Sequence, residues 1–245
     1  MSNKINLSIG DIHGELEGLD EALALVETDG GTSAKIVFLG DYTDRGKDSR
    51  GVIDRLIEGR DVGRDWTFLK GNHDRMFEWF LESPSRADQT LFIDLSWLHE
   101  RLGGRKTLAS YGLNFSNRRR LMHVHAEALV AVPHSHKEFL KACVLTYETE
   151  MLFFCHAGIR PGVALPAQTE EDLLWIREEF HTWSAPHPKL IIHGHTPVEF
   201  ATHYGNRINL DTGAGYGKAV TAAVFEGGEV HCLTSNGRKA LKNNI

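Results

Sequence analysis

Short apolar runs that each end at a glycine and are followed at once by polar ligand-type side chains constrain this chain more than any other feature. The first three runs are residues 5–9, 35–39 and 66–69, which end at Gly10, Gly40 and Gly71. Each leads into a segment with apolar residues at helical spacing, such as Leu16, Leu19 and Leu23 after the first run. Three strand–loop–helix units in succession predict a mostly parallel sheet with helices packed against it.

The alternation of strand and helix patterns stops in the middle of the chain, and patterns typical of strands return after it. We interpret residues 82–142, which contain Gly103-Gly104 and a run of arginines, as a helical insertion within a single domain spanning residues 1–245. Later strands are predicted at 143–146, 151–155, 190–192, 208–210, 219–225 and 230–233, with a helix over 170–180. Gly227-Gly228 predicts an antiparallel hairpin near the end. The fold class is therefore mixed α/β.

Size and composition fit an ordinary globular protein of the cytoplasm. A chain of 245 residues is long enough to bury a core without disulfides or a structural metal. The net charge of −6 argues against nucleic acid or an anionic membrane as the main partner. The three cysteines form no C-x-x-C pair and are predicted to be reduced thiols. We find neither a secretory signal nor an apolar stretch of membrane-spanning length.

Five of the apolar runs are followed by clusters of carboxylate, amide and imidazole side chains. The clusters are Asp11-Ile12-His13, Asp41-Tyr42-Thr43-Asp44-Arg45, Asn72-His73-Asp74, His156-Ala157-Gly158 and His193-Gly194-His195-Thr196. The carboxyl ends of strands in an α/β sheet meet in one crevice, so these loops can converge. If the first loop is extended, Asp11 and His13 face the same way and reach one cation. A single such cluster is often only a turn or a surface ion pair. Five clusters, each directly after an apolar run, are not explained by coincidence.

The donor set itself indicates the chemistry. Nitrogen and oxygen ligands without thiolate suit Mn²⁺, Fe or Zn²⁺ better than a structural cysteine site. Two cations that share a bridging carboxylate clamp a phosphate group and activate water. The sequence therefore predicts a two-metal phosphoesterase, with two divalent ions, Mn²⁺ foremost, as its cofactors.

The five clusters, in this order, resemble the phosphoprotein phosphatase family of metallophosphoesterases, and more closely its bacterial serine/threonine phosphatase branch. The segments 173–177 (Leu-Leu-Trp-Ile-Arg) and 209–214 (Asn-Leu-Asp-Thr-Gly-Ala) also resemble that branch. The resemblance implies a calcineurin-like fold, a sandwich of two mixed β-sheets flanked by helices. It also implies hydrolysis of phosphoserine and phosphothreonine monoesters by direct attack of a metal-bridging hydroxide, on a phosphorylated protein or a small phosphoester.

Residue roles follow from the resemblance, motif by motif. Three ligands of the first metal are implied at Asp11, His13 and Asp41. Asp41 would bridge to the second metal, which Asn72, His156 and His195 would complete, while His193 would support the site without binding metal. The implied catalytic residues are His73 as general acid, Asp44 as its orienting carboxylate, and Arg45 and Arg177 as phosphate-binding groups.

One departure from the family pattern keeps a second substrate class open. Asp74 stands where the family usually has Glu, and Gly-Asn-His-Asp also resembles symmetrical bis(5'-nucleosyl)-tetraphosphatases, which hydrolyse diadenosine tetraphosphate. Asp44-Arg45-Gly46 favours the protein phosphatase branch. An adenine-stacking wall would favour the other, and three aromatic residues are candidates: Trp97, Tyr111 and Tyr216. A nuclease is disfavoured, because Pro197 occupies the position of a further ligand in related nucleases.

Overall fold

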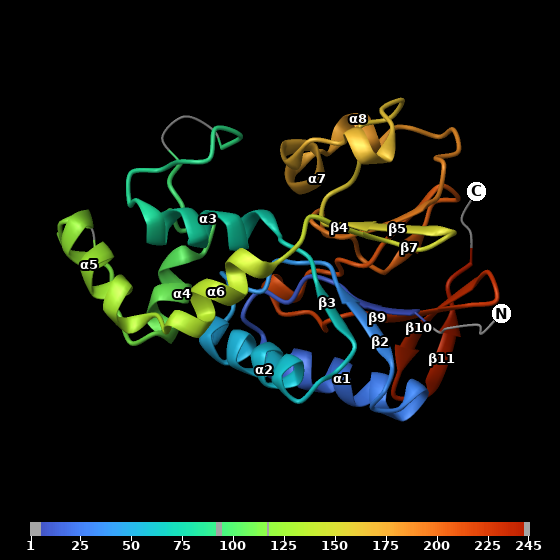
Figure 1. Ribbon diagram of the computed structural model, residues 1–245, viewed down its shortest axis with the longest axis horizontal. Helices are drawn as coiled ribbons and strands as arrows, with labels where there is room; N and C mark the ends of the chain where they lie inside the picture. Colours follow the sequence, from blue (N-terminus) through green and yellow to red (C-terminus); the bar gives the residue numbers. More distant parts are fainter. Residues whose placement is uncertain (1–5, 92–94, 117, 243–245) are drawn as a thin grey trace.

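Two β-sheets stacked face to face form the centre of the molecule, with helices on their outer faces (Figure 1). The computed structural model describes residues 6–91, 95–116 and 118–242. Within them, the predicted class of a mixed α/β protein with two mixed sheets is confirmed. Residue 5 of the first predicted strand lies outside the described residues.

The first sheet has the strand order β11-β10-β9-β1-β2-β3. Its strands are β1 (Asn6–Ile9), β2 (Lys35–Phe38), β3 (Trp66–Phe68), β9 (Ala222–Glu226), β10 (Glu229–Thr234) and β11 (Gly237–Ala240). β1 pairs in parallel with β2, and β2 with β3, as the strand–loop–helix units predict. β9 returns antiparallel to β1, and the predicted hairpin with Gly227-Gly228 joins β9 to β10.

The second sheet has the order β4-β5-β6-β8-β7. Its strands are β4 (Thr146–Glu148), β5 (Leu152–Cys155), β6 (Leu190–His193), β7 (Thr202–His203) and β8 (Arg207–Asn209). β5, β6 and β8 run parallel, so their carboxyl ends lie at one edge. The two sheets share a core of fully buried aliphatic and aromatic side chains, among them Val37, Leu39, Phe154, Ile192 and Ile208. This shared core fixes the edge of one sheet against that of the other.

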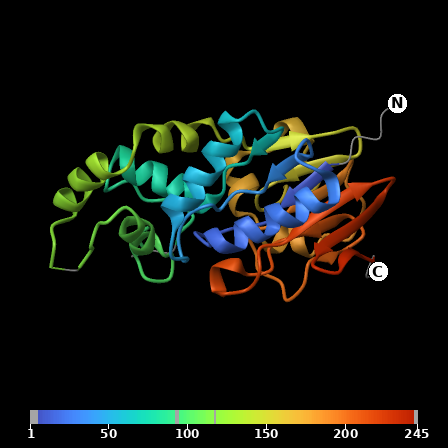
Figure 2. The same cartoon turned by 90° about the horizontal axis from the view of Figure 1, so that it is seen from below.

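Helices α1 (Leu16–Gly30) and α2 (Ser49–Asp61) cover the outer face of the first sheet, where Figure 2 shows them side by side. α1 turns Leu19, Leu23 and Val26 inward, as their spacing predicts. α2 begins where the Asp48 side chain accepts a hydrogen bond from the N–H of Gly51. The second sheet is covered by α7 (Glu170–Trp175) and α8 (Glu178–His181).

A helical extension projects from the end of the sandwich opposite β10 and β11 (Figures 1 and 2). It comprises α3 (Asn72–Glu82), α4 (Gly104–Ser110), α5 (Leu121–Ala131) and α6 (His134–Ala142). Residues 82–142, interpreted as an insertion, thus contain α4, α5 and α6. Within the extension Phe77 stacks on Trp97 with ring centroids 5.2 Å apart, and Phe80 lies 4.8 Å from the same indole. Trp97 is therefore held firmly between α3 and α4.

The predicted helix over 170–180 is wrong as a single element. Ile176 has φ −57° and ψ 140°, an extended conformation that ends α7, and α8 begins two residues later. The break turns Arg177 toward Thr196, to whose hydroxyl it donates a 3.0 Å hydrogen bond. β11 was not predicted either, since each of its residues is exposed and none shows apolar alternation. Two short 3₁₀ turns, Leu165–Ala167 and Ala214–Tyr216, complete the described elements.

In the part of the chain that the structure describes, no helix has the length and apolar character needed to cross a bilayer. Cys143, Cys155 and Cys232 are free thiols. Burial raises the pKa of the Cys143 and Cys155 thiols, which keeps both protonated and unreactive. The three thiols therefore behave as packing residues.

The buried hydroxyl of Tyr42 tests how the second loop is tied to the third. It donates a 2.6 Å hydrogen bond to the carbonyl of Leu69. In Tyr42→Phe this buried acceptor loses its partner, so we expect the free energy of unfolding in urea to fall by about 1–3 kcal/mol. Tyr204→Phe is the control, because that ring is partly exposed and its loss of a hydroxyl should change stability little. Equal stability of both variants would contradict the prediction.

Candidate metal centre

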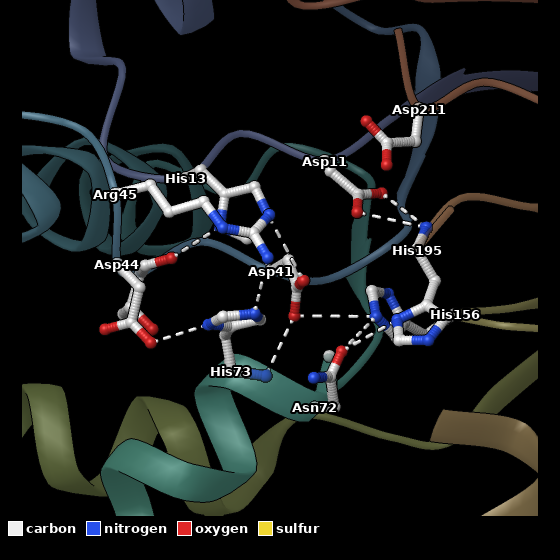
Figure 3. A network of polar contacts seen from close by, with 12 residues as sticks. Asp11, His13, Asp41, Asp44, Arg45, Asn72, His73, His156, His195 and Asp211 are labelled. Carbon is white, nitrogen blue, oxygen red and sulfur yellow. Dashed lines mark hydrogen bonds and ion pairs between the residues drawn. The ribbon is translucent and has the colours of Figure 1, made fainter. Parts of the chain in front are cut away.

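All five polar clusters meet at the edge where the two sheets adjoin (Figure 3). The loops after β1 and β2 and the start of α3 bring side chains from the first sheet. The ends of β5 and β6 bring imidazoles from the second. The six predicted metal ligands are all buried: Asp11, His13, Asp41, Asn72, His156 and His195. The structure therefore gathers every predicted ligand at one place.

One half of the site is a compact group around Asp41. The ligand atoms of Asp41, His156 and His195 all lie within 4.8 Å of one another. Asn72 Oδ1 lies 2.9 Å from His156 Nε2 and 2.9 Å from His195 Nδ1. Asp41 Oδ1 is 3.5 Å from His156 Nε2. Two imidazole nitrogens, an amide oxygen and a carboxylate oxygen thus converge, which is the donor set predicted for the second metal.

The other half joins Asp41 to His13 and His73. Asp41 Oδ2 lies 3.3 Å from His13 Nε2, and the group that could hold a cation here consists of His13, Asp41 and His73. His13 Nδ1 lies 2.8 Å from the carbonyl of Thr43, which orients the ring. Arg45 places one guanidinium nitrogen 2.6 Å from His13 Nε2 and the other 3.0 Å from His73 Nε2. Asp41 has one oxygen on each half, as a bridging carboxylate requires.

Asp11 lies at the site, but not for the expected reason. The loop after β1 is not extended, since His13 has φ +49°. The expected extended conformation is therefore wrong at His13, where the chain turns, whereas Ile12 is buried in the core as expected. Both Asp11 oxygens approach the N–H of His195, at 3.3 and 3.0 Å. Asp11 thereby connects the first sheet to the last metal-site loop of the second.

Burial sets protonation states that suit metal binding. It lowers the pKa of His13, His156 and His195, so these imidazoles are neutral near pH 7 and keep a lone pair for a cation. Burial alone would raise the pKa of Asp41, but at acidic pH, where His156 and its neighbours become protonated, their positive charges hold the pKa of this carboxyl below its ordinary value. His195 Nε2 is buried with no hydrogen-bond partner among the described residues. Neutral imidazoles beside an ionised carboxylate fit divalent cations.

His73 and Asp44 form a buried pair beside the metal-site residues. His73 Nδ1 is 2.7 Å from Asp44 Oδ2. Asp44 is held in turn by the Trp97 indole N–H, 2.9 Å from Oδ2, and by the Thr107 hydroxyl, 2.6 Å from Oδ1. The backbone N–H of His73 also donates a hydrogen bond to Asp41 Oδ1, at 3.0 Å. The imidazole is therefore fixed on one nitrogen, while Nε2 faces Arg45 and the crevice.

Comparison with known proteins agrees with this geometry. Residues 7–225 match the family described as calcineurin-like phosphoesterase. The chain belongs to that family. The resemblance seen in the sequence motifs is thus confirmed, and with it the general activity of a metallophosphoesterase, a phosphoric ester hydrolase that uses divalent metal.

Three named proteins are similar to this calcineurin-like phosphoesterase. A protein of Oceanobacillus iheyensis named bis(5'-nucleosyl)-tetraphosphatase PrpE, designated asymmetrical, is 28% identical over 240 residues, covering 89% of this chain and 87% of the relative. A solved structure provisionally named a diadenosine tetraphosphatase has a TM-score of 0.66 at 20% identity, covering 94% of this chain and 93% of its own. The cold-active protein-tyrosine phosphatase of a psychrophilic Shewanella has a TM-score of 0.64 at 16% identity, covering 98% and 81%. At such identities the two structures support the fold alone.

The charges of Arg45 and Arg177 act on one another near the metal-site residues of the phosphoesterase. Arg177 is exposed as a residue, and the neighbouring charge of Arg45 adds to partial burial in lowering the pKa of its guanidinium. Two cationic groups close enough to repel one another are suited to an anion between them. Tyr216 packs against Arg45, with the guanidinium carbon 5.0 Å from the ring centroid. The structure thus brings both predicted phosphate-binding arginines near Asp41 and near each other.

Asp74 and His193 support the site from behind. Asp74 Oδ1 accepts from the N–H of Tyr42 at 2.9 Å, and Oδ2 accepts from the N–H of Gly71 at 3.0 Å. Burial, with the charge of Asp41, raises the pKa of Asp74 to about 8. His193 packs edge-on against Phe180, on the side of the second sheet away from the ligands. Asp74, the residue that departs from the family pattern, therefore anchors the loops at Tyr42 and Gly71.

Five non-glycine residues have positive φ among those the structure describes, and every one belongs to the site. They are His13 (+49°), Asp41 (+52°), Asp44 (+73°), Arg45 (+64°) and His195 (+68°). This conformation costs about 1–3 kcal/mol per non-glycine residue and persists only where the surroundings impose it. These sharp reversals occur in three of the five loops, those of His13, Asp41 and His195, and help their side chains to reach one small volume.

Several supporting residues were not foreseen from the sequence. Trp97 and Thr107 hold Asp44 from the irregular middle of the chain, and Asp211 lies beside Asp11 (Figure 3). Asp211 stands in a motif that resembles the family, but the motif assigned it no role. Trp97 and Thr107 stand in no motif at all, so only their contacts identify them.

Gly194 tests whether Asp11 is a ligand. A Cβ at this position would lie 2.0 Å from Asp11 Oδ1, so Gly194→Ala must displace that carboxylate. We expect affinity for Mn²⁺, measured by calorimetry on metal-stripped protein, to fall roughly 10–100-fold at one of two sites. Gly31→Ala meets no atom within 4 Å but is strained by the φ of +74° at that position, so it is the control for destabilisation away from the site and should bind as wild type. Unchanged binding by Gly194→Ala would remove Asp11 from the ligand set.

Proposed function

We propose that this calcineurin-like phosphoesterase hydrolyses phosphate monoesters of alcohols, with phosphoserine and phosphothreonine as its substrate class. The observation that carries the proposal is the Asp44–His73 pair, with 2.7 Å between carboxylate and imidazole. An alkoxide is a poor leaving group, so a positioned acid matters more for an alcohol ester than for a polyphosphate. Mn²⁺ as the metal, a phosphorylated protein as the partner and a cytoplasmic location belong to the same proposal.

Each side chain has a definite task in the proposed reaction. Asp11, His13 and Asp41 would hold one cation, and Asp41 with Asn72, His156 and His195 the other. When bound, the two cations polarise the phosphate and activate water. Arg45 and Arg177 bind and orient the phosphate oxygens through charge-assisted hydrogen bonds.

His73 supplies the proton. Its Nδ1–H donates to Asp44, which stabilises the protonated imidazole and fixes its orientation. Nε2 then carries the proton that passes to the leaving oxygen of the alcohol. Trp97 and Thr107 keep Asp44 in place, because both donate hydrogen bonds to its oxygens.

A second candidate is a bis(5'-nucleosyl)-tetraphosphatase. Two observations favour it: the name of the relatives that cover most of the chain, and the environment of Tyr216. Of the three aromatic candidates for an adenine-stacking wall, Trp97 and Tyr111 are buried in the helical extension. The Tyr216 ring is 65% exposed and lies beside Arg45, where a base could stack next to a bound phosphate chain.

Product analysis tests the proposal. Metal-stripped protein reconstituted with Mn²⁺ is given a phosphothreonine peptide and, separately, diadenosine tetraphosphate. Faster phosphate release from the peptide supports the phosphomonoesterase. Faster nucleotide cleavage overturns it in favour of the second candidate, and the products then distinguish two ADP (symmetrical) from ATP plus AMP (asymmetrical). A parallel Tyr216→Ala variant should lose cleavage of the dinucleotide selectively if the ring stacks on adenine.

His73→Asn separates proton donation from metal binding. We expect turnover of the peptide substrate to fall roughly 10²–10⁴-fold, because the leaving alkoxide is no longer protonated. Metal content, measured by elemental analysis, should stay at the wild-type value. His123→Asn, an exposed histidine on α5, is the matched control. Loss of metal in His73→Asn would instead make this imidazole a ligand of the group it forms with His13 and Asp41.

A further inference from the structure

Asp211 is a buried carboxylate with an unused oxygen. It follows β8 and is 1% exposed. Its Oδ1 accepts a 2.9 Å hydrogen bond from the N–H of Gly213, which closes a tight turn. Its Oδ2 is also buried, and none of the residues that the structure describes donates a hydrogen bond to it. The turn therefore needs only one of the two oxygens.

The backbone of Asp211 is fixed on both sides. Its N–H donates to Asn209 Oδ1 at 2.9 Å, and its carbonyl accepts from the N–H of Val198, also at 2.9 Å. Val198 lies three residues after His195, so the loop that carries a metal-site histidine is tied to the residue that carries the free oxygen. The position of Oδ2 is thus set by the site and does not depend on a mobile side chain.

The Asp211 carboxylate lies beside that of Asp11, as Figure 3 shows. The Asp41 carboxylate is a third acidic group in the same view. Arg45 and Arg177 are the cationic groups that act on Asp211. Buried carboxylates that face one another are unfavourable unless a cation or a proton lies between them. Three acids at one place therefore indicate more positive charge than the two arginines supply.

A purely structural role does not explain this arrangement. An asparagine or serine would close the turn at Gly213 equally well, since one acceptor oxygen is enough. A carboxylate in that position adds a charge that destabilises the folded chain next to Asp11. The free oxygen and the added charge both fit a divalent cation, which prefers oxygen donors and gains affinity with ligand charge.

We propose that Asp211 is a further residue of the metal site, whose Oδ2 supplies a carboxylate oxygen and negative charge to the cation held by Asp11 and His13. The proposal rests on the use of divalent metal by the family and is independent of which phosphoester is the substrate. It assigns a task to Asp211 that the Asp-Thr-Gly turn alone would not need.

The test measures metal binding and metal-free stability in one variant. In Asp211→Asn, calorimetric titration of stripped protein with Mn²⁺ should show one site weakened roughly 10–100-fold and the other unchanged. The unfolding temperature of the stripped variant should equal or exceed that of stripped wild type, because a repulsion with Asp11 is removed. A role confined to closing the turn would not produce this combination.

Asp88→Asn is the control, as it removes a different buried acid, one that pairs with Arg75 at 2.6 Å outside the site. It should lower the unfolding temperature and leave both Mn²⁺ affinities unchanged. Wild-type affinity in Asp211→Asn overturns the proposal, as does weakening of both sites together with lower metal-free stability. If stripped wild type itself binds no Mn²⁺, the metal requirement of the proposed function fails first, so the two failures are distinguishable.

Discussion

Burial of the Asp41 carboxylate at the junction of two sheets is the constraint on which the rest of the site depends. Removing a charge from water costs several kcal/mol unless it is paired and hydrogen-bonded. The partners come from both sheets: His13 and the His73 N–H from the first, and His156 from the second. The stacking of the sheets and the ionisation of one side chain are therefore coupled. A shift of one sheet against the other would remove the His156 contact and leave the carboxylate with its partners from the first sheet alone.

The helical extension supports the proposed proton donor indirectly. Through Trp97 and Thr107 it determines how Asp44 is held, and Asp44 determines how His73 is held. The packing of Trp97 against Phe77 and Phe80 therefore helps to position the proposed proton donor, because Trp97 contacts Asp44 and Asp44 contacts His73. The part of the chain with the weakest sequence pattern supports the residue on which the substrate proposal depends.

Where the signals in the chain are local, the sequence predicted the strands and the gathering of the polar residues that follow them. Apolar runs ending in glycine located β1, β2 and β3, and the polar residues after them proved to share one volume. The reasoning failed where the backbone is unusual, as at His13, whose left-handed conformation replaces the expected extended loop. It could not reach Thr107, because that hydroxyl meets Asp44 across 63 residues of chain and no local pattern encodes such a contact. The break before Arg177 was hidden for a similar reason, since its partner Thr196 belongs to another loop.

The left-handed ligand residues have a consequence for how such a protein changes over time. Strain of about 1–3 kcal/mol at each of several positions is comparable to the net stability of a typical domain, about 5–15 kcal/mol. Replacing one of these residues by glycine would relax the turn and remove a ligand in the same step. Substitutions here that raise the free energy of unfolding would therefore also remove the activity. Selection for activity then keeps the stability of the protein below the highest value that the fold allows.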